Sequence, residues 1–231
     1  MVALAWDLKQ SLHLKAPRTT GLSSHCPFSE CLKLVMNERL SQISYDDLPA
    51  SVKPLADDIL KISSAALGGP YNALLRSPEM ARRCFDFLDY LRFRTSVNKR
   101  LNEFAILIQA RISNAQYEWW AHETIARKAG LSDAVMKDLQ ACKRPNSMAD
   151  DERLVYDYCV QLSLNHRVPD ALWQEAVNKM GEQAVIDLTV LSGTYVMVSM
   201  LLNATQVGIP GGGAFPLEVL DPSDIRKRLL A

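Results

Sequence analysis

Apolar residues recur at helical spacing in one segment after another, from Ser44 to about residue 206, and this pattern constrains the fold more than any other feature. No segment shows the sustained alternation of apolar and polar residues, with β-branched enrichment, that is typical of strands. No repeat of roughly 20–50 residues is present either. The sequence therefore predicts an all-α architecture of about eight helices with short connections.

Cap and breaker residues delimit these helices. Asn98 and Ser132 are predicted N-caps, and Gly130 is a predicted glycine at the end of a helix. The eight expected helices open after Ser44 or Asp46 (with a break at Leu67-Gly68-Gly69-Pro70), at Ser77-Pro78-Glu79, at Asn98, at Gln116 (to Ala129), at Ser132, at Asp150, at Pro169 (to Gly181) and at residue 184 (to 206).

The first part of the chain lacks this periodicity. Residues 1 to about 40 show no sustained pattern, and APRTTGLSSHCP (16–27) is typical of a loop. A length of 231 residues suits one domain with an extension. We expect an irregular extension over 1–40 and a helical domain over 41–231. The opening segment has Asp7 and no basic region, so it is a poor secretory signal.

Charge balance and the polar residues of the most apolar segment argue against nucleic acid and a membrane as partners. Lys plus Arg and Asp plus Glu are 26 each, so there is no basic excess of the kind a general nucleic-acid binder needs. The segment 185–206 is apolar enough to suggest a membrane span, but it carries Asp187, Asn203 and Gln206. We expect a buried helix there, and neither nucleic acid nor membrane as a partner.

The cysteines favour a cytoplasmic protein with reduced thiols. Their number is odd and no pair has CxxC spacing, so neither a disulfide framework nor a zinc site is indicated. The five are Cys26, Cys31, Cys84, Cys142 and Cys159. We expect no metal.

Glu103 is the first residue that breaks the apolar pattern. On a helix its same-face neighbours are Ile106, Leu107 and Ala110, beside a face that is already apolar. A buried carboxylate needs a partner, or it takes up a proton and its pKa rises. The structural alternative to a functional role is an acid paired with Arg94 or Arg111.

The segment Tyr117-Glu118-Trp119-Trp120-Ala121-His122 is the second unusual feature. Glu118 and His122 are one helical turn apart and project from one side, next to bulky aromatics. Such a pair suits a partly desolvated pocket for a planar organic ligand. Both lie early in their helix, where the dipole disfavours an imidazolium at His122. The alternative is an exposed acid–base pair beside an interfacial aromatic patch.

These residues lie within a longer run that resembles a known family. GGPYNALLRSPEMARR (68–83), YLRFRTS (90–96) and RLNEFAILIQAR (100–111) lead into NAQYEWWAHETIARKAGLS (114–132). The run resembles the carboxymuconolactone decarboxylase-like branch of the alkylhydroperoxidase-like superfamily, over about Ser44 to Pro216. The resemblance implies an all-helical bundle that associates into trimers or hexamers.

The resemblance also separates two chemistries. The peroxidase branch carries an upstream acid, a CxxC pair and a histidine, and here Ala115 and Glu118 stand where the two cysteines would be. Without a thiol pair, peroxidase chemistry based on a disulfide is disfavoured. The decarboxylase branch keeps a Glu and a His at the positions of Glu118 and His122, and it needs neither metal nor organic cofactor.

The decarboxylase reading assigns a role to each residue. Loss of CO2 next to a conjugated carbonyl leaves a dienolate, which must be stabilised and protonated on carbon. His122 would stabilise the enolate and deliver the proton, Glu118 would orient it or relay the proton, and Glu103 would support both. Arg94 or Arg111 would anchor the substrate carboxylate. The Arg92/Arg94 pair in LRFRTS is a candidate anchor too, and its alternative is a solvated turn with charges. The predicted pocket wall consists of Tyr117, Trp120, Tyr71 and Tyr195.

The sequence thus predicts a cofactor-independent lyase acting on a carboxylated lactone, a keto acid or a polyketide-like small molecule. The same residues would also serve an isomerase, a cyclase or a dehydratase, and a non-catalytic ligand-binding or scaffold protein is the alternative outside enzymes. The apolar 184–206 helix and the tryptophan-rich segment exceed what a small helical domain covers. We therefore expect a homo-oligomer, as a dimer, trimer or hexamer.

Overall fold

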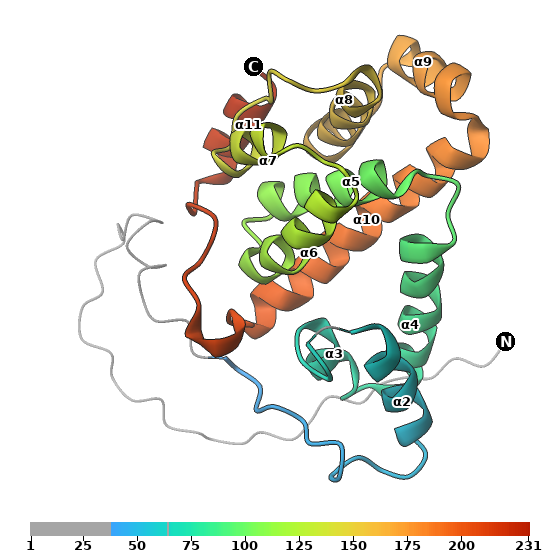
Figure 1. The fold of residues 1–231 in the computed structure, drawn as a ribbon, viewed down its shortest axis with the longest axis vertical. Helices are drawn as coiled ribbons and strands as arrows, with labels where there is room; N and C mark the ends of the chain where they lie inside the picture. The colour runs from blue at the N-terminus through green and yellow to red at the C-terminus, as the bar shows by residue number, and fades with distance from the viewer. Residues whose placement is uncertain (1–37, 64) are drawn as a thin grey trace, which may run out of the picture.

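The computed structural model describes residues 38–63 and 65–231, and these form an all-α fold (Figure 1). Within the described residues there are ten α-helices and one short 3-10 helix, and no strand. They are α2 (Lys53–Ile62), α3 (Pro70–Leu74), α4 (Pro78–Phe93), α5 (Lys99–Ile112), α6 (Gln116–Lys128), α7 (Asp133–Gln140), α8 (Asp150–Asn165), α9 (Asp170–Met180), α10 (Glu182–Thr205), η1 (Pro210–Gly212) and α11 (Pro222–Leu229).

The predicted all-α class is confirmed, and two helices were missed. The five-residue α3 lies in the segment that was expected only to break a helix, and α11 follows Asp221, whose side chain accepts a hydrogen bond from the backbone of Ser223. The helix expected to run up to Leu67 ends at Ile62. A helix of five residues shows too few turns for its periodicity to be recognised in a sequence.

Several predicted helix ends follow from their local residues. The Asn98 side chain accepts a hydrogen bond from the Arg100 amide and begins α5, and the Ser132 side chain does the same for Val135 in α7. Gly130 has φ of 99° just after α6, a conformation that is accessible to glycine. These predicted caps are confirmed.

Helix α5 is the centre of the fold. It packs against α6, α8 and α10, which surround it in Figure 1. The sequence predicted one apolar stripe on this helix, but eleven of its fourteen residues are buried, on all sides. A polar residue between Leu101 and Arg111 is therefore enclosed by the core whichever way it points.

The core consists of two hydrophobic clusters. The larger surrounds α5 and includes Phe104, Trp119 and Tyr158, and the smaller lies around α2, α3 and the start of α4 and includes Ile59, Tyr71 and Phe85. Helix α10 contacts α3 and α4 as well as α5, so it joins the two clusters. The candidate site lies where they meet.

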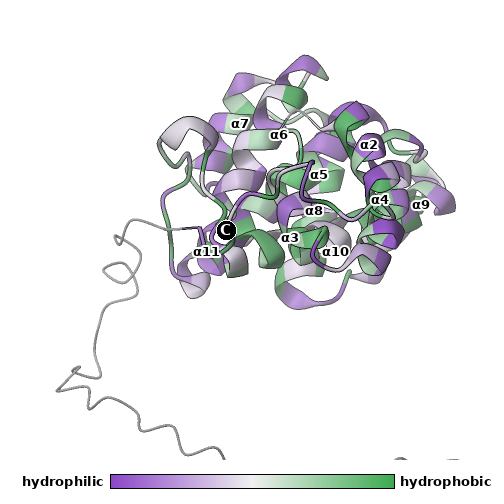
Figure 2. Cartoon of the chain, turned by 90° about the horizontal axis from the view of Figure 1, so that it is seen from below, coloured by the Kyte–Doolittle hydropathy of each residue, from purple (hydrophilic) through white to green (hydrophobic). Residues whose placement is uncertain are grey.

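Helix α10 is long and apolar enough to cross a membrane, with a mean hydropathy of 1.8 over an 18-residue window, and it is among the green, hydrophobic parts of the ribbon in Figure 2. However, 56% of that window is buried inside the fold. Its buried side includes Asp187, which accepts hydrogen bonds from the backbone and the hydroxyl of Ser96 at 3.1 Å each. This burial is that of a core helix.

The domain boundary expected at residue 40 falls inside a segment that is bonded to the helical body. The backbone N–H of Arg39 donates to Thr205 O at 3.0 Å, and Glu38 accepts from the Gly208 amide at 3.1 Å. The rest of the expected extension, with Cys26 and Cys31, lies outside the described residues.

Candidate active site

Glu103, Glu118 and His122 come together in the core, between α5 and α6. The imidazole of His122 lies between the two carboxylates: its Nδ1 is 2.6 Å from Glu103 Oε2, and its Nε2 is 3.0 Å from Glu118 Oε1. All three side chains are buried. The three residues predicted to be catalytic thus form one contiguous group, with Glu103 touching His122 directly.

Lys99 extends this group towards solvent. Its Nζ lies 2.6 Å from Glu103 Oε1, and its side chain is 40% exposed. The two atoms do not have the alignment of a hydrogen bond, so the contact is an ion pair. Lys99, Glu103, His122 and Glu118 therefore form a continuous row of ionisable groups, which we call the acid–base chain, from the surface into the core.

The local sequence explains this arrangement. Glu118 and His122 are one turn apart on α6, which places both on one side of that helix. Helix α5 is buried all round, and α6 packs against it after a turn in which Asn114 has φ of 51°. The alternative that Glu103 pairs with Arg94 or Arg111 is wrong. Its charged partners are Lys99, one turn earlier on α5, and His122.

The two carboxylates determine the charge of His122. Burial lowers the pKa of the imidazole, but the negative charges of Glu103 and Glu118 and their hydrogen bonds outweigh it, so the pKa is raised above 6.5. The sequence argument from the helix dipole favoured a neutral imidazole; two carboxylates in direct contact dominate that weaker effect.

The same contacts act in the opposite direction on Glu103. Burial raises the pKa of its carboxyl group, but His122 and Lys99 together lower it from 4.5 to about 2. A buried carboxyl without partners would have a raised pKa. Glu103 is therefore ionised, and not the protonated acid that burial alone would produce.

The inner hollow, as we call the pocket beside these groups, is enclosed by α3, α4, α6 and α10. It holds about 560 Å³ of empty space, including open solvent at its mouth. Glu118 and His122 line it, and so do three predicted aromatics, Tyr71, Tyr117 and Tyr195, together with aliphatic side chains such as Leu88, Ile125 and Val198. The ring of Tyr195 meets His122 edge-on, with centroids 5.3 Å apart.

The phenols of the inner hollow stay protonated at neutral pH. Burial raises the pKa of Tyr71 above 10, partly opposed by Arg92, and it raises the pKa of Tyr195 further above its usual value. A neutral phenol donates a hydrogen bond. Both hydroxyl groups are therefore available as donors to an anionic oxygen.

Arg92 is the arginine next to the candidate site, and the sequence analysis considered it only as part of the Arg92/Arg94 pair. It lines the inner hollow, and its buried Nε has no hydrogen-bond partner among the described residues. Burial lowers the pKa of its guanidinium, but Tyr195, Tyr71, Glu103 and Glu118 raise it above the usual value for arginine, so Arg92 stays charged. Residues 92 and 94 are about 200° apart around a helix, so only one of them can face the site.

Arg94 and Arg111 lie elsewhere, and neither lines the inner hollow. Arg94 is 59% exposed and forms an ion pair with Asp89 at 2.7 Å. Arg111 is fully buried and donates to the carbonyl groups of Gln140 at 3.2 Å and Glu218 at 2.9 Å, and to Asn114. Its role is to tie α5 to the segment before α11.

Trp120 also lies outside the inner hollow. Its side chain is exposed, and its ring packs on Tyr117 with centroids 5.5 Å apart. It therefore supports the outer side of Tyr117. Its neighbour Trp119 is fully buried in the larger hydrophobic cluster.

Residues 38–63 and 65–231 contain no group of three or more His, Cys, Asp or Glu side chains that can hold a metal ion. Cys84, Cys142 and Cys159 are free thiols, and none lines the inner hollow. The polar side chains that line the inner hollow are one carboxylate, an imidazole, a guanidinium, three phenols and a serine hydroxyl.

Comparisons with protein-family models, with curated proteins and with solved structures each give no match. The likeness to the carboxymuconolactone decarboxylase-like family therefore rests on the sequence motifs alone.

We predict that the Arg111→Leu variant loses about 3 kcal/mol of unfolding free energy, because it removes the hydrogen bonds from a fully buried guanidinium to the carbonyl groups of Gln140 and Glu218. Arg94→Leu is the matched control, and removal of its exposed ion pair costs less than about 1 kcal/mol. Urea unfolding measures both. Equal losses would contradict the structural role of Arg111.

We predict that Glu103→Gln destabilises the protein most between about pH 4.5 and 6.5. The contribution of Glu103, whose folded pKa is lowered, is complete above 4.5 and is lost as pH falls towards about 2. The contribution of His122, whose folded pKa is raised, is complete below 6.5 and is lost as pH rises through that folded pKa. Within the window the loss is about 3 kcal/mol.

The control for this pH profile is Glu123→Gln on the same helix as His122. Glu123 forms a surface ion pair with Arg127 at 2.9 Å, so its removal costs little and the cost does not vary across this window. Urea unfolding at a series of pH values tests both variants. A flat profile for Glu103→Gln would contradict a charged pair between Glu103 and His122.

Proposed function

We propose that this protein is a cofactor-independent lyase that removes CO2 from a carboxylated lactone, a keto acid or a polyketide-like small molecule. The observation that carries the proposal is the acid–base chain, which ends at a pocket that also holds the charged Arg92. We further propose that the all-α fold is an alkylhydroperoxidase-like bundle of the carboxymuconolactone decarboxylase-like branch, on the strength of the motifs around Glu103 and Glu118-x-x-x-His122.

The charges of the site suit an anionic substrate. Lys99, Arg92 and protonated His122 are three cations, against two carboxylates, Glu103 and Glu118. The site therefore carries one excess positive charge when both acids are ionised. One bound anion neutralises that excess in a partly desolvated pocket.

The proposed step conserves the charge of the substrate. The bond between the carboxylate carbon and its neighbour breaks, its electron pair enters the conjugated carbonyl system, and neutral CO2 leaves behind a dienolate anion. Arg92 and the hydroxyl groups of Tyr71 and Tyr195 line the same hollow and are donors to that anion. Only contacts that strengthen as charge moves onto the carbonyl oxygen speed the step.

The acid–base chain then supplies the proton that the dienolate carbon takes up. His122 Nε2 faces Glu118 at 3.0 Å, so a proton moves from the imidazolium to Glu118 and from Glu118 to the substrate carbon. Glu103 holds the ring at Nδ1 and stabilises its charged form. A proton from solvent then returns to Nε2 by way of Glu118, through the open mouth of the inner hollow.

Two alternatives to decarboxylation are tested by the experiment described below. A proton relay next to an anion-binding group equally serves isomerisation, cyclisation or loss of water, and a non-catalytic member would only bind its ligand. Peroxidase chemistry lacks its thiols, because Ala115 and Glu118 occupy the positions of the CxxC cysteines.

We predict that the wild-type protein releases CO2 from a member of a panel of carboxylated lactones, β-keto acids and aryl polyketide acids, without added metal or thiol. His122→Ala lowers the rate by about 100-fold or more, as loss of a general acid does. Arg92→Met raises KM, and Arg94→Met is the matched control that leaves both constants unchanged. CO2 detection and mass spectrometry of the product measure these effects, and in D2O the product carries one deuterium at the decarboxylated carbon.

Each result of this experiment leads to a different conclusion. A change of substrate without CO2 release would contradict the lyase and favour an isomerase, cyclase or dehydratase at the same site. No turnover of any compound, together with ligand binding that Arg92→Met weakens, would favour the non-catalytic protein. An equal loss of rate in Arg94→Met and Arg92→Met would contradict the assignment of Arg92.

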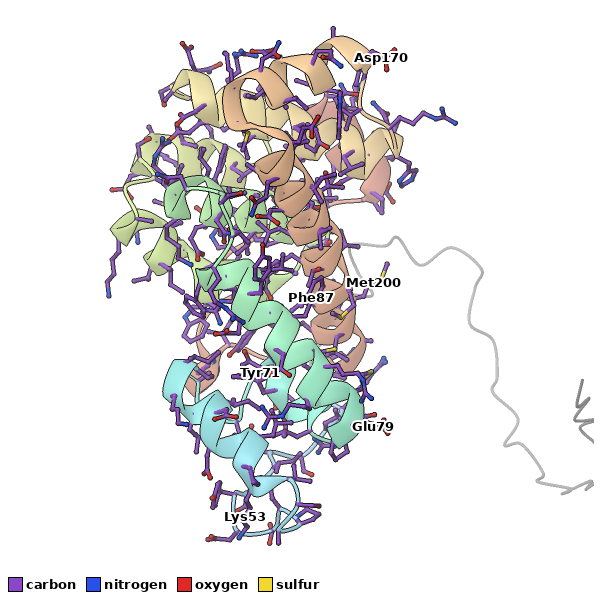
Figure 3. The ribbon with its side chains drawn as sticks, turned by 90° about the vertical axis from the view of Figure 1, so that its right-hand side faces the viewer. Lys53, Tyr71, Glu79, Phe87, Asp170 and Met200 are labelled. Carbon is purple, nitrogen blue, oxygen red and sulfur yellow. The ribbon has the colours of Figure 1, made fainter. Side chains whose placement is uncertain are left out.

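We also propose that the protein is a homo-oligomer in which a second copy covers the exposed face of α10. Along that face, at alternating intervals of four and three residues, lie Ile186, Val190, Gly193, Met197 and Met200, and Met200 is 67% exposed. Such spacing is that of a helix packed against another helix. Phe87 of α4, a helix that packs against α10, is also exposed, and Figure 3 labels it together with Met200.

We predict that the double variant Met197→Glu/Met200→Glu dissociates the oligomer, because association would bury unpaired charges. Light scattering then gives a mass near 25.8 kDa for the variant and a multiple of it for the wild type. Lys128→Glu on α6 makes the same change in net charge and leaves the wild-type mass unchanged. A wild-type protein that is monomeric at micromolar concentration would contradict the oligomer.

A further inference from the structure

A second hollow lies directly beside the inner one, and we call it the outer hollow. It is enclosed by the segment before α2, by α3 and by the chain that follows α10, and it also holds about 560 Å³ of empty space, including open solvent at its mouth. Ala65, Gly68 and Tyr117 line both hollows. The two therefore meet along the loop before α3.

Tyr117 separates the two hollows. Burial raises the pKa of its phenol to about 12, with further contributions from Glu118 and Tyr71, which line the inner hollow, and from Glu38, which lines the outer one. Groups that line both hollows thus raise the pKa of the Tyr117 hydroxyl group. Trp120 packs against the Tyr117 ring and holds it in this position.

The loop beside Tyr117 depends on a glycine. Gly69 has φ of 60°, and a Cβ atom at this position would lie 2.5 Å from the Tyr117 hydroxyl oxygen, closer than atoms can approach. Only a residue without a side chain lets the phenol pack this near to the backbone. At Gly69 the boundary between the hollows is therefore a close contact with Tyr117, whereas at Ala65 and Gly68, which line both hollows, the two adjoin.

The two hollows differ in charge. The inner hollow presents Arg92 and His122, whereas the described residues that line the outer one include no Lys, Arg or His. The outer hollow presents the Glu38 carboxylate and the Gln42 amide next to Val207 and Pro210. Carboxylate and amide oxygens accept hydrogen bonds, so this hollow suits an uncharged group that carries a hydroxyl donor.

We propose that the two hollows form one elongated site for a two-part substrate, and that Tyr117 is the residue that sets its length. The anionic head of the substrate lies in the inner hollow near Arg92. A neutral, hydroxyl-bearing tail passes between Tyr117 and the loop from Ala65 to Gly68 and ends in the outer hollow near Glu38 and Gln42. This inference rests on the proposed function for the identity of the anionic head.

The test compares two probes by isothermal titration calorimetry. Benzoate occupies only the inner hollow, and para-(para-hydroxyphenoxy)benzoate adds a hydroxylated tail. For the wild-type protein we expect the long probe to bind at least about tenfold more tightly than benzoate, because its tail buries a further aromatic ring.

Two variants fill the outer hollow from opposite sides. Gln42→Trp adds bulk at an exposed residue of the segment before α2, and Gly208→Leu adds a side chain beside Glu38, where a Cβ atom meets Oε1 at 3.4 Å. Each is expected to weaken the long probe about tenfold and to leave benzoate unchanged. Lys137→Trp, exposed on α7, is the control and changes neither affinity.

Three results would overturn the inference. They are a long probe that binds no more tightly than benzoate, a long probe whose affinity neither filling variant changes, and filling variants that weaken benzoate as much as the long probe. Arg92→Met is expected to weaken both probes equally. Because the measurement is binding, an absence of CO2 release together with the expected probe pattern would contradict the proposed function and leave the two-part site standing.

Discussion

An imidazole held between two buried carboxylates is the interaction on which the rest of the site depends. Removing Glu103, Glu118 and His122 from water is unfavourable for each alone, and the structure offsets this by direct contacts at 2.6 and 3.0 Å and by Lys99 at the far carboxylate oxygen. Such a row is stable only when every member is present. Its cost in stability suggests that the row serves a purpose other than folding.

The position of this row follows from the architecture. Helix α5 is buried on all sides from Leu101 to Arg111 and α6 packs along it, so the side chains between the two helices are buried. The row reaches a ligand only because the two hydrophobic clusters leave a hollow where they meet. Tyr71 comes to that hollow from the smaller cluster, and Tyr195 comes from α10 in the larger one. Residues more than 120 positions apart in the sequence thus line one hollow.

Much of this arrangement could be predicted from the sequence, and the failures have physical reasons. Most helices with a cap and several turns were predicted, because periodicity and caps are local signals. Helix α3, with five residues, has too few turns, and α11 was missed although Asp221 caps it, because only Ile225 and Leu229 are buried. Glu103, Glu118 and His122 were found because they interrupt apolar surroundings. Their mutual contact required the packing of α5 on α6, which no local pattern encodes.

The arginines show the same limit. Arg94 and Arg111 were chosen for their charge near the motif, yet one faces solvent and the other ties backbone carbonyl groups together. Arg92 reaches the hollow because of the rotation of α4 against its neighbours. To choose between Arg92 and Arg94, one must know which face of α4 is buried. Leu88 and Leu91 lie on that face, and Arg92 is one helical turn after Leu88.

The measurement that tests this account most directly is an NMR titration of the His122 imidazole in the isotopically labelled protein, assigned with the His122→Ala variant. The account predicts a pKa above 6.5 that falls in Glu103→Gln, because the carboxylates stabilise the imidazolium. A pKa at or below 6.5 that Glu103→Gln does not change would show that His122 is neutral and would contradict the acid–base chain.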